Sequence, residues 1–139
     1  MKDKIFLLSV DEYERYYDKI PKYDADDKDY EYRWWLRTPY KKNFASSSSR
    51  AFYVDSDYGY VNISLVVYSF AVRPALNLNG LSSENDEFEY LGIKWIKLSN
   101  RLAIAKEPIF NSVFDYNRQD YEHSDIRKKL LAWYKQKTT

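Results

Sequence analysis

The sequence of 139 residues has no cysteine and a single histidine, His123. The missing cysteines exclude disulfides, thiolate metal ligands and cysteine nucleophiles. One histidine excludes histidine-rich metal sites and leaves a serine–histidine catalytic pair only one base. Because His123 directly precedes Ser124, which is expected to cap a helix, we predict a surface histidine rather than a catalytic one. These absences favour a binding protein without a cofactor over an enzyme.

Long apolar runs are also missing. The longest uncharged run of mainly apolar character, residues 61–72, is too short and too polar to span a bilayer. Lys2, Asp3 and Lys4 lead directly into an apolar tetrapeptide, which is not the pattern of an export signal. The three glycines form no glycine-rich phosphate loop. We therefore expect a cytoplasmic protein of one domain, without membrane contact.

Aromatic residues are abundant instead, with 15 tyrosines and 4 tryptophans. Tyrosine offers a large amphipathic contact area with few rotatable bonds, so binding surfaces use it heavily. Some of these aromatic residues can build the core, but the hydroxyl of each buried tyrosine needs a hydrogen-bond partner. The number of tyrosines therefore predicts that several of them form an exposed recognition surface.

The net charge of +1 conceals a segregated distribution. Residues 11–31 carry nine acids and four bases, whereas residues 32–50 carry five bases and no acid. The acidic stretch 24–29 lacks the glycine and distal glutamate of a calcium loop. A near-neutral total argues against nonspecific nucleic-acid binding, although a local basic segment keeps that function open.

The order of predicted elements gives an α+β class with a mostly antiparallel sheet and two main helices. Residues 5–8 are typical of a buried strand, and Ser9 with Glu12 forms a capping box that starts a helix. Four residues recur at helical spacing before Pro21: Tyr13, Tyr16, Tyr17 and Ile20. Ser124 is expected to cap a last helix with these residues on one face: Ile126, Leu130, Trp133 and Tyr134.

Strands are predicted over these segments: 33–37, 51–54, 60–63, 65–70, 71–78, 93–98 and 102–105. Asp55 and Asp57 lie in a turn, where aspartate binds its own backbone more often than it forms a catalytic dyad. Of Trp34 and Trp35, which alternate along a strand, one is expected in the core and the other near the surface. Residues 108–120 are expected to form a loop.

Four ordered blocks resemble an uncharacterised bacterial and phage domain family: residues 4–12, 34–39, 52–59 and 71–76. That resemblance implies a C-type-lectin-like fold, which is also that of the formylglycine-generating enzymes. The resemblance does not imply the oxidase activity of the formylglycine-generating enzymes, because that activity needs cysteines and this sequence has none. Calcium-dependent sugar binding is not implied either, since Glu107-Pro108-Ile109 lacks the amide residue of the calcium-binding lectins.

The second half resembles the segment that precedes these blocks in the family. Residues 90–96, 102–105 and 124–131 carry this likeness, so the halves stand in reversed order. We predict a circularly permuted single domain over 1–139, in which residues 80–87 link segment 1–79 to segment 88–139. The alternative is a homo-oligomer in which neighbouring chains exchange halves.

The function predicted from these observations is a non-catalytic module that binds a macromolecule, with a host or phage protein as the expected partner. A phage or mobile-element accessory protein, active against host defence, fits this type. The expected binding residues are Tyr40, Arg50, Tyr53, Tyr58, Tyr60, Asn62 and Tyr68. The alternative is a nucleic-acid-binding protein that stacks tyrosines on bases and uses these cations: Arg33, Arg37, Lys41, Lys42 and Arg50.

Overall fold

The computed structural model describes residues 3–23, 30–40, 49–79, 85–117 and 120–139. The acidic stretch 24–29, the lysines Lys41 and Lys42, and most of the predicted linker lie outside the described residues. Within these ranges the helices and strands have the following bounds: β1 (Ile5–Phe6), α1 (Val10–Arg15), β2 (Arg33–Pro39), β3 (Arg50–Asp55), β4 (Val61–Leu65), β5 (Ser69–Val72), β6 (Ala75–Asn77), β7 (Glu87–Tyr90), β8 (Ile93–Lys97), β9 (Leu102–Ala105), β10 (Phe110–Val113) and α3 (Asp125–Lys137). Short 3₁₀ turns cover Tyr17–Lys19 and Tyr121–His123.

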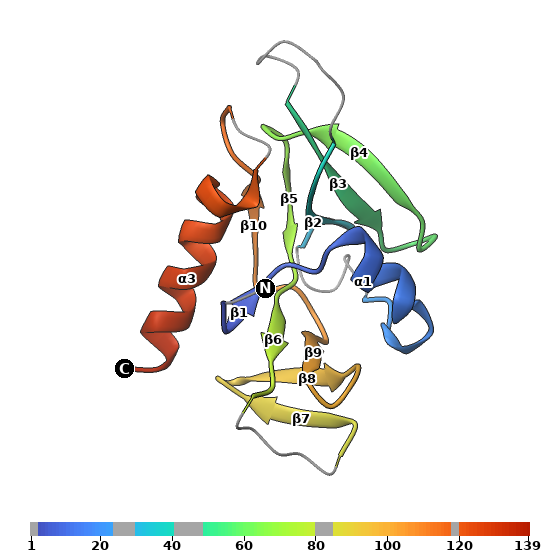
Figure 1. The fold of residues 1–139 in the computed structure, drawn as a ribbon, viewed down its shortest axis with the longest axis vertical. Helices are drawn as coiled ribbons and strands as arrows, with labels where there is room; N and C mark the ends of the chain where they lie inside the picture. The colour runs from blue at the N-terminus through green and yellow to red at the C-terminus, as the bar shows by residue number, and fades with distance from the viewer. Residues whose placement is uncertain (1–2, 24–29, 41–48, 80–84, 118–119) are drawn as a thin grey trace.

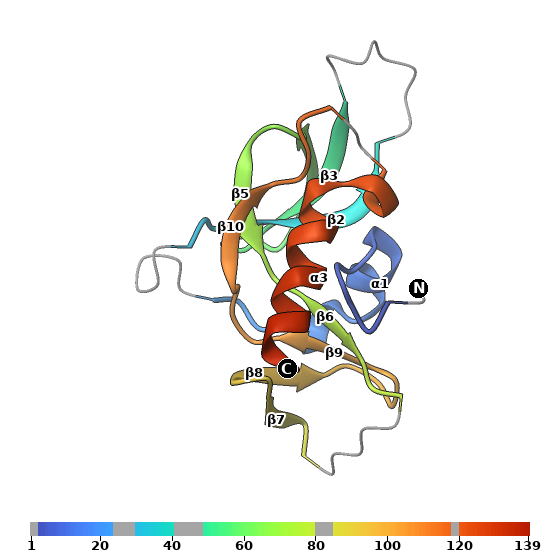
Figure 2. The ribbon, with the colours of Figure 1, turned by 90° about the vertical axis from the view of Figure 1, so that its left-hand side faces the viewer.

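The strands form two five-stranded sheets, in the orders β1-β6-β9-β8-β7 and β10-β5-β2-β3-β4. All described pairings are antiparallel except that of β2 with β5. Figure 1 shows α3 and α1 on opposite sides of β1, β5 and β10, and Figure 2 shows α3 at the front, with β5 and β10 to its left and α1 to its right. The predicted α+β class with a mostly antiparallel arrangement is confirmed. Within the described residues, no helix has the length and apolar character needed to cross a membrane.

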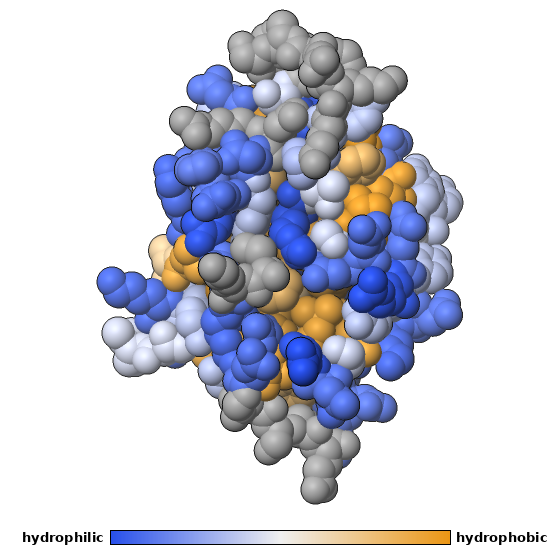
Figure 3. Space-filling view, viewed as in Figure 1, coloured by the Kyte–Doolittle hydropathy of each residue, from blue (hydrophilic) through white to orange (hydrophobic). Residues whose placement is uncertain are grey.

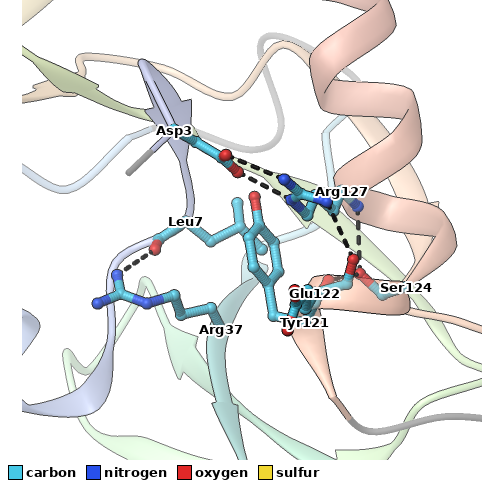
Figure 4. Close-up of polar contacts among 7 residues, drawn as sticks. All are labelled: Asp3, Leu7, Arg37, Tyr121, Glu122, Ser124 and Arg127. Atoms are coloured by element: carbon cyan, nitrogen blue, oxygen red, sulfur yellow. Dashed lines mark hydrogen bonds and ion pairs between the residues drawn. The ribbon is translucent and has the colours of Figure 1, made fainter. Parts of the chain in front are cut away.

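The two halves of the chain are built into the same two sheets. β6 lies between β1 and β9, and β5 lies between β10 and β2, so each sheet contains strands from before and after residue 80. Arg127 on α3 adds a two-pronged ion pair to Asp3, at 2.9 and 3.0 Å. Figure 4 shows this pair beside the buried ring of Tyr121. Neither half has a complete sheet without the other.

Helix α1 begins at the predicted capping box. The Ser9 hydroxyl accepts from the Glu12 amide at 3.1 Å, and the Glu12 carboxylate accepts from the Ser9 amide at 2.8 Å. The same carboxylate oxygen accepts from Arg37 on β2 at 2.6 Å, which fastens the helix to the sheet. The helix is shorter than predicted, because it ends at Arg15 and a 3₁₀ turn continues to Lys19.

Replacing Glu12 with glutamine is expected to lower the free energy of unfolding at pH 7 by about 1–2 kcal/mol. Burial by itself raises the pKa of Glu12, but the Arg37 guanidinium and the Ser9 amide outweigh it and hold that pKa below its usual range. The unfolded chain therefore binds this proton more tightly, so the stabilisation is complete above the unfolded pKa and disappears as the pH falls. Urea unfolding of both proteins at pH 7 and near pH 3 measures this.

Glu14→Gln on the exposed side of the same helix is the matched control, and its stability should differ little from wild type at either pH. A Glu12→Gln deficit that persists undiminished near pH 3 would contradict the assigned role of the charge.

Both tryptophans of β2 are buried, which corrects the prediction that one of them lies near the surface. Trp34 packs edge-on against Tyr13 from α1, and Trp35 packs against Phe70 and Phe114 on the opposite face. Both faces of the sheet are covered at β2. Successive side chains of this strand therefore point into packed regions on either face, and neither of the two tryptophans reaches solvent. Trp95 is fully buried in the other sheet.

Two further predictions about strands were wrong. Residues 108–120 are not a loop throughout, because Phe110–Val113 forms β10 and pairs with β5 along its whole length. Residues 65–70 are not one strand: Leu65 ends β4, a turn follows, and β5 starts at Ser69 and pairs with β10 and β2. The predicted strands 93–98 and 102–105 are confirmed as β8 and β9, which pair as a hairpin.

Candidate binding face

The candidate site lies on one face of the sheet β10-β5-β2-β3-β4, in its outer part. Tyr53 in β3 pairs with Asn62 in β4 and with Trp35 in β2, so these side chains share a face. The exposed residues around this face are Tyr32, Tyr58, Tyr60 and Tyr68, of which Tyr58 is the most exposed at 72%. We call this set, with Tyr53 and Asn62, the tyrosine face.

Its floor is made of rings. Phe70 is buried, with its centroid 4.6 Å from that of Trp35 and 4.9 Å from that of Tyr53. Tyr68 tilts onto the same ring at 6.5 Å, so a continuous aromatic layer runs from the core to solvent. Because packed rings have few free torsions, this face is already ordered before any partner binds.

Arg33 fills the gap between Tyr32 and the aromatic floor. Its guanidinium carbon lies 4.8 Å from the Tyr32 ring centroid and 4.5 Å from that of Phe70. Its Nη2 donates to the Glu31 carboxylate at 2.7 Å. Burial alone lowers the pKa of Arg33, but the bond to Glu31 outweighs it and raises that pKa, so the guanidinium stays charged.

The β3–β4 turn presents Tyr58 and Tyr60. The Asp55 carboxylate accepts from the amides of Asp57 and Tyr58, at 2.9 and 3.3 Å, which confirms the predicted role of Asp55 in the turn. Gly59 has a φ of +80°, a conformation that favours glycine, and a Cβ there would meet Tyr17. With the turn fixed, the rings of Tyr58 and Tyr60 stack at 5.9 Å.

The hydroxyls of Tyr53 and Tyr60 remain protonated at neutral pH. Burial raises the pKa of Tyr53, and burial together with the Asp55 carboxylate raises that of Tyr60. Each hydroxyl can therefore donate as well as accept a hydrogen bond. With the Asn62 amide beside them, the face offers rigid apolar area and polar groups in alternation.

The structure separates two of the predicted binding residues from the others. Arg50 pairs with Leu65 on the opposite face of β3 and β4, and Tyr40 packs against Phe52 on that side at 6.0 Å. Phe52, Ile63 and Leu65 are half-buried there, and Figure 3 shows a hydrophobic area over β4. Tyr53, Tyr58, Tyr60, Asn62 and Tyr68 are brought together, without Tyr40 and Arg50.

The described cations of the alternative nucleic-acid site, Arg33, Arg37 and Arg50, are not gathered into one basic surface. Arg33 is paired with Glu31, and Arg37 is paired with Glu12 on the α1 side of the sheet. Arg50 lies at the far end of β3, and Lys41 and Lys42 are outside the described residues. The single histidine, His123, is exposed and pairs with Asp120 at 2.6 Å.

Sequence analysis missed two members of the site. Tyr32 precedes β2 and was not assigned to a strand, and Phe70 was placed in a strand without a face. Alternation along a strand could have placed Phe70 on the same face as Val72. It could not have placed Phe70 beside Tyr53, because these residues are in different strands and the order of the strands in the sheet is needed for that. In the described part of the chain, no group of three or more acidic or histidine side chains could hold a metal ion.

Comparison with known proteins gives one finding. A family model described as a domain of unknown function (DUF6273) matches residues 1–80. The match covers β1 to β6 and therefore every residue of the tyrosine face. Searches among curated proteins and among solved structures find no match.

Proposed function

The chain belongs to the DUF6273 family, and from this premise we propose that it is a non-catalytic module that binds a protein partner through the tyrosine face. The observation that carries the proposal is the gathering of Tyr53, Tyr58, Tyr60 and Tyr68 on one preformed face with Asn62 among them. Tyrosine is among the residues that contribute most to binding energy at protein interfaces.

Rigidity and polarity support a protein partner. The rings are held by Phe70 and by the Asp55 turn, so binding immobilises few side chains and loses little entropy. The exposed hydroxyls and the Asn62 amide can satisfy a partner's backbone groups. The charge of Arg33 is already neutralised by Glu31. A neutralised ion pair is suited to the polar rim of a protein interface and would attract a polyanion such as nucleic acid only weakly.

We also propose that the fold is C-type-lectin-like in permuted order, which supports the choice of face. The family match ends at residue 80, and residues 85–139 supply the strands that complete both sheets. The resemblance to lectin-like domains implies that the segment carrying the tyrosine face corresponds to their variable ligand surface. It also motivates a host protein as partner, with this chain as a phage or mobile-element accessory protein.

Replacing Tyr58, Tyr60 and Tyr68 together with alanine is expected to weaken partner binding by about 30-fold or more, since central aromatic residues each contribute about 2 kcal/mol. The measurement is a pull-down from host lysate, with and without nuclease, followed by mass spectrometry and a titration of the retained protein. The three side chains are at least half exposed, so the fold should be unaffected.

Tyr134→Ala is the matched control, because Tyr134 lies on α3 and interacts with Tyr90 of the other sheet. A partner that is retained by wild type and by the control, but lost by the triple variant, supports the proposal. A partner retained equally by all three proteins would refute the assigned face. Recovery that disappears with nuclease and is insensitive to the tyrosines would favour the nucleic-acid alternative instead.

A further inference from the structure

A cavity of about 250 Å³ lies on the side of the sheet opposite the tyrosine face, beneath α1 and the 3₁₀ turn that follows it. Its walls include the rings of Tyr13, Tyr17 and Trp34. This volume is smaller than that of pockets for drug-sized ligands and suits a molecule of about one ring. The flat walls favour a planar ligand.

The same cavity is lined by the buried guanidinium of Arg73. Nε donates to the Ala105 carbonyl at 2.8 Å, and Nη2 donates to the carbonyls of Pro21 and Lys106 at 2.7 and 2.9 Å. Nη1 donates to none of the described residues, and no described carboxylate forms an ion pair with Arg73. Among the described residues, the cavity therefore borders a buried positive charge whose Nη1 has no protein acceptor.

The remaining polar groups fit an oxyanion. Ser56 lines the cavity with a hydroxyl that accepts from the Tyr23 amide and can donate its own proton. Lys22 and Asp18 also line it and carry opposite charges, so Arg73 leaves the lining residues with a net positive charge. Because Nε and Nη2 already donate to carbonyls, Nη1 is the nitrogen that can donate to a carboxylate oxygen, and a charge-assisted bond of this kind is strong at a buried cation.

We propose that this cavity binds a small carboxylate attached to a planar group, with the carboxylate on Arg73 and the planar group between Trp34 and Tyr17. A free aromatic acid and the C-terminal carboxylate of an aromatic residue share this chemistry. The site is distinct from the tyrosine face and does not depend on the protein partner proposed above.

The test is titration of the ¹⁵N-labelled full chain with benzoate and, in a separate arm, with N-acetylphenylalanine, to about 10 mM so that millimolar affinity is detected. The reporter is the indole N–H resonance of Trp34, and the matched uncharged probes are benzamide and N-acetylphenylalanine amide. Saturable shifts at Trp34 with either acid, but not with its amide, support the site. Saturation by benzoate alone indicates a free acid, and saturation by both acids includes a peptide terminus.

Two rim variants test the electrostatics without altering Arg73. Lys22→Gln should weaken benzoate binding about threefold and Asp18→Asn should strengthen it by a similar factor, whereas Lys128→Gln on α3 should leave it unchanged. Equal shifts with benzoate and benzamide, absence of a Trp34 shift at the highest concentration, or identical affinities in the two rim variants would overturn the proposal.

Discussion

Replacing Arg73 with alanine is expected to lower the free energy of unfolding by about 3–5 kcal/mol. The substitution leaves the carbonyls of Pro21, Ala105 and Lys106 without the donor that they share. It also removes the cation that lies 5.2 Å from the Trp34 ring centroid. Burial lowers the pKa of Arg73 to about 10, so the side chain is still charged at neutral pH and its bonds are charge-assisted.

These carbonyls belong to distant parts of the chain, so Arg73 fastens the end of the 3₁₀ turn to the end of β9. Urea unfolding, followed by tryptophan fluorescence, measures the loss. Arg73→Lys keeps the charge but not the planar fork, and we expect an intermediate loss of about 2 kcal/mol. A loss below about 1 kcal/mol for Arg73→Ala would show that water replaces the guanidinium and that the assigned role is wrong.

Trp34→Ala and Trp35→Ala are each expected to cost about 3–5 kcal/mol, because both indoles are buried and a cavity remains after truncation. Trp34 is 1% exposed and Trp35 is fully buried. Trp35 also donates its indole N–H to the Ser112 carbonyl at 3.0 Å, so its loss weakens the contact of β2 with β10.

Trp133→Ala on α3 is the control for these substitutions, because Trp133 is half-buried and packs at the edge of the core. Its cost should be about 1 kcal/mol. Thermal and urea unfolding of the three variants measure these losses. Large losses for both Trp34→Ala and Trp35→Ala indicate that both faces of β2 are buried, whereas a large loss for only one of them indicates that one face is buried. If either β2 variant costs no more than Trp133→Ala, that tryptophan lies on an open face of the sheet and the fold described here is wrong there.

The sequence predicts well those elements whose signals are local. The capping box of Ser9 and Glu12, the turn built on Asp55 and the Ser124 cap of α3 each depend on residues within a few positions of one another. The β8–β9 hairpin is likewise local, since its strands are separated by a short turn.

Features that depend on distant partners were not predicted. β10 has no strand signal strong enough to outweigh Pro108 and its polar neighbours, and it forms because β5 offers a free edge. Trp34 and Trp35 are both buried because α1 covers one face and Phe114 the other, which no pattern within β2 reveals. Tyr53 pairs with Asn62, and this register puts both side chains on the face opposite Arg50. The register depends on how β3 and β4 pair, so it could not be derived from either strand alone.

The most direct test of the tyrosine face is photo-crosslinking from within it. Asn62→p-benzoylphenylalanine places a short-range crosslinker among Tyr53, Tyr60 and Tyr68, and the same replacement of exposed Lys128 on α3 is the control. Irradiation in host cells is predicted to give a discrete protein adduct from position 62 and none from position 128. The same adducts from both positions, or adducts to nucleic acid alone, would contradict the proposal that this face binds a protein.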